Sequence, residues 1–305
     1  MSEAINVFDR RLVRRHRDRA AGGLARHDFL YREVGERVAD RLDDVKRSFP
    51  KALDLGCHDG ALAGMLGRRG CIERLVQCDL SPVMARAAAA EGRPVLAADE
   101  EWLPFAPGSF DLVMSVLSLH WVNDLPGALI QIRRALKDDG LFLGAMLGGE
   151  TLHELRTALM QAEIAEEHGA SPRVSPFADL RDAGALLQRA GFGLPVVDRD
   201  VITATYPNAF ALMAALRGMG ESNAVHARRR TASRRATMLR AAEIYQETFA
   251  RDRGDVPATF EIIYLTAWAP DTSQPRALRP GSAHSRLAEA LDTEEIPAGE
   301  KARPE

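Results

Sequence analysis

The sequence predicts an α/β fold: a doubly wound, mostly parallel sheet with helices on both faces. Strand-like apolar runs alternate with helix-like segments from residue 52 to residue 147, which is typical of this class. The first run is followed by a glycine-containing turn and a helix start, the arrangement of a nucleotide-binding βα loop. Because such crossovers are right-handed, we expect ligands at the carboxyl ends of the first, second and fourth strands.

Hydrophobic periodicity and turn residues give the individual elements. A nearly continuous apolar run, residues 110–117, predicts a central strand covered on both faces. Gly140 is expected to stop the helix before the fifth strand. Seven strands are predicted: 52–55, 75–78, 94–97, 110–117, 141–147, 196–205 and 259–268. Helices are predicted within 7–21, 28–42, 61–69, 81–91, 125–136, 151–168 and 177–190, with a helical insertion at 207–252 that can roof a site as a lid.

Length and composition limit the possible classes of protein. The 305 residues carry a net charge of −3, so nucleic acid is not an expected partner. No apolar run reaches membrane-spanning length. The three cysteines lack CxxC spacing and are interpreted as buried thiols in a reducing cytosol, not as metal ligands. We expect a helical cap at 1–45, a main domain at 46–270 and a disordered tail at 271–305.

The first turn has the features of a ribose-binding site. Gly56 and Gly60 permit a tight turn before the first helix. Asp79 ends the second strand, 19 residues after Gly60. A carboxylate at this distance is placed to accept hydrogen bonds from ribose hydroxyls.

Charge indicates which nucleotide-like ligand this turn would hold. Asp54 and Asp59 would repel a pyrophosphate, and His58 stands where a middle glycine would let phosphate approach. The same carboxylates suit a ligand with an ammonium and a sulfonium group, a ribose and no phosphate. S-adenosylmethionine (SAM) has these features. An ordinary βα turn in a sheet without a nucleotide remains the alternative.

Several longer strings make the chain resemble the mitochondrial complex I assembly factor 5 family and its bacterial relatives. They run in order from about residue 5 to about residue 270. The two most specific strings are SLHWVNDLP at 118–126 and GMGESN at 218–223. The others are NVFDR at 6–10, DEEWLPF at 99–105, GAMLGGETLHELR at 144–156 and VPAT at 256–259.

The resemblance implies a class I SAM-dependent methyltransferase fold, a Rossmann-like seven-stranded sheet with a helical lid insertion. It also implies modification of an arginine, by hydroxylation or methylation, in the small iron–sulfur subunit of NADH:quinone oxidoreductase. His58 departs from the family's usual glycine. The family motif already starts at residue 7, so we expect no targeting segment and a bacterial cytoplasmic protein, held at the inner membrane only through its partner.

Placement after the strands gives the candidate cofactor residues. Asp54 and Gly56 should hold the methionine end, and Gly60 should let the helix pack closely. His58, in the same loop, is a further cofactor-binding candidate. Asp79 should bind the ribose. Residues that should contact the adenosine, or lie over the transferred group, are Leu80, Met84, Asp99, Glu100, Trp102 and Ser115. The Arg-rich run at 10–19 carries the N-terminal motif and is expected to close over this site.

The candidate substrate residues lie after the fourth strand and in the insertion. His120 is a candidate general base, since imidazole titrates near neutrality; capping a helix or holding a loop is the alternative. Glu221 and Asn223 are candidates for an arginine substrate, because a carboxylate matches a guanidinium. Trp121 and Tyr206 are candidates for the pocket wall. The alternatives are a loop tryptophan anchored in the core for Trp121, which the sequence favours, and a surface or helix-capping residue for Tyr206. Glu150 and Glu154 are rivals to Glu221.

Two further functions stay open from the sequence. One is an O-methyltransferase acting on a small molecule or an acyl carrier, similar to the malonyl-carrier methyltransferase of biotin synthesis. The other is a non-enzymatic assembly chaperone that uses SAM only to order its fold. No metal site is predicted, because His153 adjoins Glu154 without the His-x-carboxylate spacing of non-haem iron oxygenases.

Overall fold

The computed structural model describes residues 6–67, 69–177, 179–275, 282 and 287–294. The chain divides into two units, residues 1–271 and residues 272–305. Among its described residues, the second unit contains one short helix, α10 (Leu287–Ala290). Much of the predicted disordered tail lies outside the described residues. The predicted boundaries at residues 45 and 270 stay predictions.

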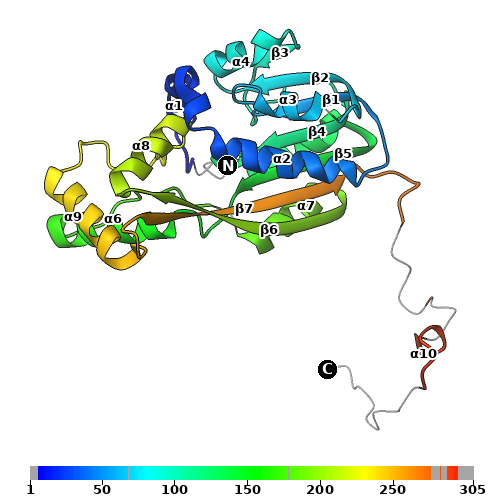
Figure 1. Cartoon of the computed structure of the whole chain (residues 1–305). Coiled ribbons are helices and arrows are strands. Elements are labelled where there is room, and N and C mark those ends of the chain that lie inside the picture. The colour runs from blue at the N-terminus through cyan, green and yellow to red at the C-terminus, as the bar shows by residue number, and fades with distance from the viewer. Residues whose placement is uncertain (1–5, 68, 178, 276–281, 283–286, 295–305) are drawn as a thin grey trace, which may run out of the picture. The chain divides into compact units, whose positions relative to one another are not determined.

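A seven-stranded sheet of order β3-β2-β1-β4-β5-β7-β6 is the centre of the first unit (Figure 1). The neighbours from β3 to β5 pair in parallel, whereas β7 is antiparallel to both β5 and β6. The predicted doubly wound, mostly parallel class is thereby confirmed. The strands are β1 (Phe49–Leu55), β2 (Ile72–Asp79), β3 (Val95–Ala97), β4 (Phe110–Val116), β5 (Leu136–Leu147), β6 (Gly193–Tyr206) and β7 (Val256–Trp268).

Helices cover both faces of this sheet. Two buried apolar clusters, one on each face, contain side chains of different helices. The first includes α2 (Phe29–Asp43) and α3 (Ala61–Gly67); the second includes α5 (Leu125–Ala135) and α7 (Leu180–Arg189). The remaining helices of this unit are α1 (Arg10–Ala20), α4 (Pro82–Ala88), α6 (His153–Glu167), α8 (Ala209–Met219) and α9 (Arg235–Phe249). Helices α1 and α8 lie side by side, and α6 packs on α9 (Figure 1).

Local capping residues explain where several helices begin. The Ser81 side chain accepts a hydrogen bond from the Met84 amide at the start of α4, where Pro82 occupies the first turn. Asp124 and Asn208 cap α5 and α8 in the same way. Helix α8 ends at Gly220 with φ +87°, a left-handed conformation that glycine adopts at little cost.

The predicted helix stop at Gly140 is wrong. Helix α5 ends at Ala135, and β5 begins at the next residue, Leu136. Residues 137–140 belong to the strand, and the β4–β5 register shifts between Phe110 and Leu112. Gly140 thus lies at the irregular start of β5 and not at a helix end, because pairing with β4 outweighs the tendency of glycine to end a helix.

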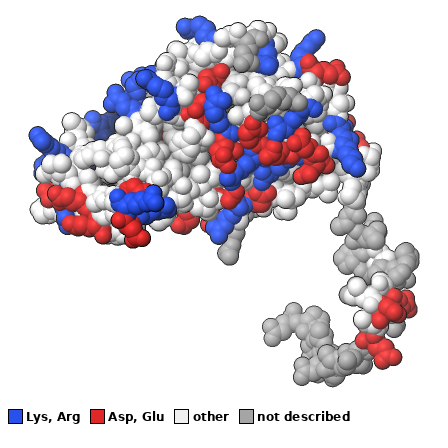
Figure 2. Space-filling model, viewed as in Figure 1, with Lys and Arg blue, Asp and Glu red and all other residues white. Residues whose placement is uncertain are grey.

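Charged side chains on one face of the unit are largely paired with each other. Figure 2 shows red and blue side chains intermixed over part of this face. Arg37 and Arg41 of α2 pair with Asp200 and Asp198 of β6, and Arg69 pairs with acidic residues of the same helix. Surface pairs of this kind contribute little to stability individually. Among the described helices, none has the length and apolar character needed to span a bilayer.

Candidate active site

The β1–α3 turn adopts the backbone conformation that its sequence predicted. Gly56, His58 and Gly60 have φ values of +74°, +51° and +86°. His58 therefore occupies a left-handed position that favours glycine, as its place in the motif indicated. A Cβ at Gly60 would lie 3.0 Å from the Ala88 Cβ, so the glycine lets α4 approach. A Cβ at Gly56 would lie 2.2 Å from the Ser118 Oγ.

Asp54 is a buried carboxyl group beneath this turn. Its Oδ2 accepts a hydrogen bond of 3.2 Å from Gln77 Nε2. Burial raises the pKa of Asp54 to about 7, and the charges of Asp79 and Asp59 act in the same direction, while the Gln77 contact opposes them. Near neutral pH a much larger fraction of Asp54 is therefore protonated than of an ordinary aspartate.

Asp54→Asn should make the protein more stable at pH 8 than the wild type. A carboxyl whose folded pKa is raised binds its proton more tightly in the folded chain, so wild-type stability should fall as pH rises from about 4 to about 7. The variant removes this loss, which amounts to roughly 4 kcal/mol. Denaturant unfolding between pH 4 and pH 8 measures it. Parallel pH profiles for the two proteins would contradict the prediction.

Asp79 ends β2 with both carboxylate oxygens engaged. Oδ1 accepts a hydrogen bond of 2.7 Å from the Ser81 amide. Oδ2 accepts one of 3.1 Å from the His58 amide and pairs with the Arg17 Nη1 at 3.2 Å. The strand end, the turn and α1 thus converge on the carboxylate for which the sequence predicted a ribose-binding role.

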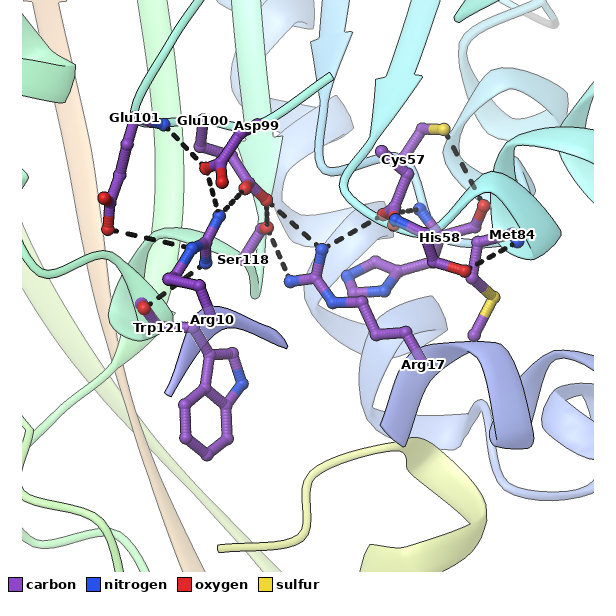
Figure 3. Close-up of polar contacts among 12 residues, drawn as sticks. Arg10, Arg17, Cys57, His58, Met84, Asp99, Glu100, Glu101, Ser118 and Trp121 are labelled. Carbon is purple, nitrogen blue, oxygen red and sulfur yellow. Dashed lines mark hydrogen bonds and ion pairs between the residues drawn. The ribbon is translucent and has the colours of Figure 1, made fainter. Parts of the chain in front are cut away.

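Two arginines of α1 contact the acidic residues that follow β3. Arg10 pairs with Asp99 at 2.6 Å and with Glu100, and its Nη1 donates to the Trp121 carbonyl at 3.3 Å. Arg17 pairs with Glu100 at 3.2 Å and donates to the Ser118 Oγ at 2.8 Å. Figure 3 shows both guanidinium groups pointing into this acidic cluster. The structure therefore brings α1 to the predicted cofactor residues, as its N-terminal motif indicated.

Ionic pairing keeps Glu100 charged although it is fully buried. Burial by itself raises the pKa of this carboxyl. Arg10 and Arg17, with a hydrogen bond from Ser118, outweigh burial and lower the pKa to about 2. The Arg17 side chain is only 1% exposed. The individual role of Arg17 was missed by sequence reasoning, because nothing in the Arg-rich run distinguishes it from its exposed neighbours.

The other predicted cofactor residues divide by burial. Met84 and Ser115 are fully buried, and the Ser115 hydroxyl has no hydrogen-bond partner among the described atoms. Leu80 packs against the small cluster formed by Phe8, Val13, Trp121, Ala224 and Val225. Trp102 is 78% exposed and forms a backbone bridge with Asp99. A flanking role for the Trp102 ring therefore has no support from packing, and it stays a prediction.

Glu221 is the centre of a second polar cluster. Its Oε1 accepts a hydrogen bond of 2.9 Å from the Tyr31 hydroxyl. Its Oε2 accepts one of 2.8 Å from Trp121 Nε1 and lies 3.1 Å from His120 Nε2. Burial by itself raises the pKa of Glu221, but His120, Arg17 and the Tyr31 hydrogen bond outweigh it and lower the pKa to about 2. Burial also raises the pKa of Tyr31 well above its ordinary value, so Tyr31 keeps its proton and donates.

An apolar cavity of about 250 Å³ adjoins this carboxylate. Glu221 and Trp121 line one part of it, and Ser222, Asn223 and Arg173 contribute further polar groups. Most of the wall is aliphatic or aromatic, from α6, α8, β7 and the segments next to them: Leu30, Leu147, Leu152, Leu155, Leu159, Val174, Phe177, Met213, Leu216, Met219, Met238 and Phe260. A mostly apolar cavity with few polar groups is the usual form of a ligand site.

The structure distributes the remaining candidates differently. Asn223 lines the cavity, but its amide donates to the Pro172 carbonyl at 2.7 Å and its oxygen accepts from the Val225 amide. Tyr206 is not among the lining residues, and its buried hydroxyl has no partner among the described atoms. Glu154 bonds the Thr259 side chain and backbone, so it fastens α6 to β7. Glu150 is exposed.

Two expectations about metals and thiols can be compared with the described part of the chain. No group of three or more His, Cys, Asp or Glu side chains there has a metal-binding arrangement. All three cysteines are free; Cys57 and Cys78 are buried, whereas Cys71 is half-buried. Burial raises the pKa of both buried thiols well above the ordinary value, so they stay protonated.

Comparison with known proteins agrees with this geometry. Residues 53–144 match the family described as methyltransferase domain. The fold is similar to the YcgJ protein of Bacillus subtilis, with TM-score 0.55 and 15% identity over 77% of this chain and 98% of that one. It is also similar to phosphoethanolamine N-methyltransferase 2 of Haemonchus contortus, with TM-score 0.52 and 16% identity over 85% of this chain and 60% of that one. At these identities the likeness shows the fold.

Curated relatives share much more of the sequence. Arginine-hydroxylase NDUFAF5, mitochondrial, of Danio rerio is 46% identical over 291 residues, covering 94% of this chain and 90% of the relative. The Homo sapiens protein of the same name is 47% identical over 283 residues, covering 92% and 81%. Malonyl-[acyl-carrier protein] O-methyltransferase of Methylovorus sp. is 37% identical, covering 87% and 90%. The chain is a methyltransferase-fold enzyme and belongs to the NDUFAF5 family.

Proposed function

We propose that this enzyme binds SAM at the carboxyl ends of β1 and β2 and modifies an arginine of the small iron–sulfur subunit of NADH:quinone oxidoreductase. The buried, ionised Glu221 at the wall of an apolar cavity is the observation that carries the arginine part of this proposal. Relatives named arginine-hydroxylase, 46% and 47% identical, support it. The bacterial cytoplasmic location expected from the sequence stays a prediction.

The cavity suits an arginine side chain in two respects. Its aliphatic wall would bury the methylene stem, and Glu221 would attract the guanidinium. Two carboxylate oxygens offer about four acceptor sites, of which Tyr31, Trp121 and His120 use three. One site on Oε1 therefore stays available for a guanidinium N–H.

The chemistry of the acidic residues fits SAM. Asp79, at the end of β2, would accept from the ribose hydroxyls, and Asp99 and Glu100 would accept from the adenine amino group or balance a positive charge. The cluster already holds two cationic guanidinium groups, which shows that it stabilises positive charge in a buried setting. When bound, SAM supplies an activated methyl group, and this chain's residues would position the acceptor.

His120 is the proposed general base. Glu221 contacts its Nε2, while its buried Nδ1 has no hydrogen-bond partner among the described atoms. A carboxylate on one ring nitrogen orients the imidazole and leaves the other nitrogen to take a proton. His120→Asn should lower kcat by about 10²-fold or more with folding retained. His153→Asn, at a half-exposed ring, is the control, and equal rates for both variants would exclude this role.

A carboxylate in this position disfavours the malonyl-carrier alternative. The substrate named for the relatives at 37% identity carries a carboxyl group. Glu221 would repel this group strongly, because the apolar cavity screens charges poorly. An arginine and a malonyl group thus require opposite charges at the same point. Glu221 favours the arginine.

Mass spectrometry of the small iron–sulfur subunit tests the proposal. The subunit is incubated with the enzyme and SAM, with and without oxygen. An arginine heavier by a methylene group irrespective of oxygen would establish a methyltransferase. Addition of one oxygen atom, in the presence of an electron donor, would establish a hydroxylase. An unchanged subunit would contradict the proposed substrate. It would favour the acyl-carrier methyltransferase or the assembly chaperone instead.

A further inference from the structure

The carboxylates of the proposed cofactor site are already engaged by one helix. Arg17 pairs with Asp79 and Glu100 at 3.2 Å each, and Arg10 pairs with Glu100 and with Asp99 at 2.6 Å. The Asp79 and Glu100 side chains are fully buried. We call Arg10 and Arg17 the arginine latch. Figure 3 shows that both side chains reach this cluster from the same stretch of chain.

The latch competes with SAM for space and charge. The Asp79 Oδ2 accepts from both Arg17 and the His58 amide, and Oδ1 accepts from the Ser81 amide. Three of about four acceptor sites are therefore in use, and both hydroxyls of a ribose can bind only if one donor leaves. A sulfonium brought among buried carboxylates would also be repelled by a guanidinium a few ångströms away. Binding of this cofactor therefore requires Arg17 to leave Asp79.

The segment that carries the latch also holds the lid beside the Glu221 cavity. Phe8 and Val225 form an antiparallel bridge. The Asp9 amide donates to the Ala224 carbonyl at 2.8 Å, and the His226 amide donates to the Val7 carbonyl at 2.7 Å.

Helix α1 also contacts a residue of the cavity wall. His16 Nδ1 lies 3.1 Å from the Ser222 carbonyl, and Ser222 and Asn223 line the cavity. Movement of residues 7–20 would therefore change the cavity wall. The two proposed ligand sites share this one structural element.

We propose that the arginine latch closes the cofactor site in the ligand-free enzyme, that SAM binding releases it, and that residues 7–20 transmit this release to the wall of the Glu221 cavity. The inference rests on SAM being the cofactor. It makes binding ordered, with SAM first and the arginine substrate second. By thermodynamic reciprocity, the substrate also strengthens SAM binding.

Weakening the latch tests the first step. Arg10→Gln removes the ion pairs with Asp99 and Glu100, and the full-length variant should bind SAM at least about threefold more tightly by isothermal titration calorimetry. Arg11→Gln is the matched control, because Arg11 is an exposed neighbour with no ion pair among the described residues. Unchanged SAM binding by Arg10→Gln would overturn the latch. Weaker binding would also overturn it, because it would mean that Arg10 helps to bind the cofactor.

A reversible disulfide tests the second step without removing either arginine. Phe8 and Val225 are a non-hydrogen-bonded antiparallel pair, flanked by the two backbone bonds, and such pairs have Cα atoms about 4.5 Å apart, within disulfide range. Oxidised Phe8→Cys/Val225→Cys should bind SAM at least about tenfold more weakly than the same protein after reduction. Equal affinities would overturn the coupling. Val225→Cys alone controls for added thiols, and peptide mapping confirms the bond.

Hydrogen exchange gives a readout that does not depend on catalysis. SAM should speed exchange at the amides of Asp9 and His226 in the wild type, because both bonds hold the segment to the lid. Slower or unchanged exchange would overturn the release. Failure of the wild type to bind SAM would instead remove the proposed cofactor. The arginine assignment at Glu221 would then still be open to the mass measurement.

Discussion

Glu221→Gln is expected to reduce modification of the arginine substrate by about 10²-fold or more in kcat/KM. The change keeps the shape of the side chain and removes the charge that would pair with the guanidinium. Breaking a buried charged contact by neutralising one partner typically costs about 3 kcal/mol or more, which corresponds to that factor. The rate of modified-subunit formation by mass spectrometry measures it. Glu150→Gln, at an exposed glutamate between the cavity residues Leu147 and Leu152 in the sequence, should retain wild-type rates.

The pH dependence of stability separates this effect from simple loss of structure. The folded pKa of Glu221 is about 2, below its ordinary value of 4.5. A lowered folded pKa contributes stability that is present above pH 4.5 and disappears as pH falls towards 2. The wild type should therefore be more stable than Glu221→Gln at pH 7, and the difference should vanish near pH 2. Wild-type turnover by a well-folded Glu221→Gln enzyme would refute the substrate assignment.

Arg17→Met is expected to destabilise the ligand-free protein by about 3–5 kcal/mol at pH 7. Removing one member of a buried ion pair leaves the other charge uncompensated, and here Asp79 and Glu100 both lose a partner. Denaturant unfolding measures the loss. Arg14→Met is the matched control on the same helix: its side chain is 53% exposed and 3.8 Å from Asp18, so its change should stay within about 0.5 kcal/mol.

A second substitution shows whether the loss comes from charge. Arg17→Met/Glu100→Gln should recover part of the stability, because it removes one of the two carboxylates that lose Arg17; Glu100 keeps its pair with Arg10 in the single variant, so the recovery should be incomplete. Release of the latch by SAM should cost less than this truncation, since an arginine that moves to solvent stays hydrated and a cationic ligand then faces the carboxylates. A loss below about 1 kcal/mol for Arg17→Met would mean that water or other groups compensate these charges.

How far the sequence predicted the fold can be seen at the first turn and at the fifth strand. Gly56 and Gly60 have the positive φ values that the tight turn required, and His58, the predicted departure from the usual glycine, also has a positive φ. These are local backbone requirements, so a short string of residues reveals them. The prediction for Gly140 was wrong because it depends on a non-local contact. The same glycine suits a helix end or an irregular strand start, and the pairing of Leu136 with Phe110 decided between them.

The sequence indicated the acidic residues of the candidate site but not the residues that contact them. Asp79 follows a strand at a fixed spacing from Gly60, and Glu221 lies in a specific string. The position of Tyr31, which bonds Glu221 from 190 residues away, has no local sequence signal. The Trp102 ring is 78% exposed, and its place beside the adenine stays a prediction. Long-range contacts depend on the packing of α1, α2 and the lid, which periodicity does not encode.

The sequence by itself determined the order and type of the elements, the tight first turn and the acidic character of the proposed cofactor site. Each of these follows from backbone preferences and spacing within about thirty residues. Only the tertiary structure decided that Arg17, and not an exposed arginine of the same helix, enters the acidic cluster. Only it brought Tyr31, His120 and Trp121 onto Glu221. The physical reason is burial: unpaired charges cannot remain away from water, so the folded chain selects the partners that neutralise them.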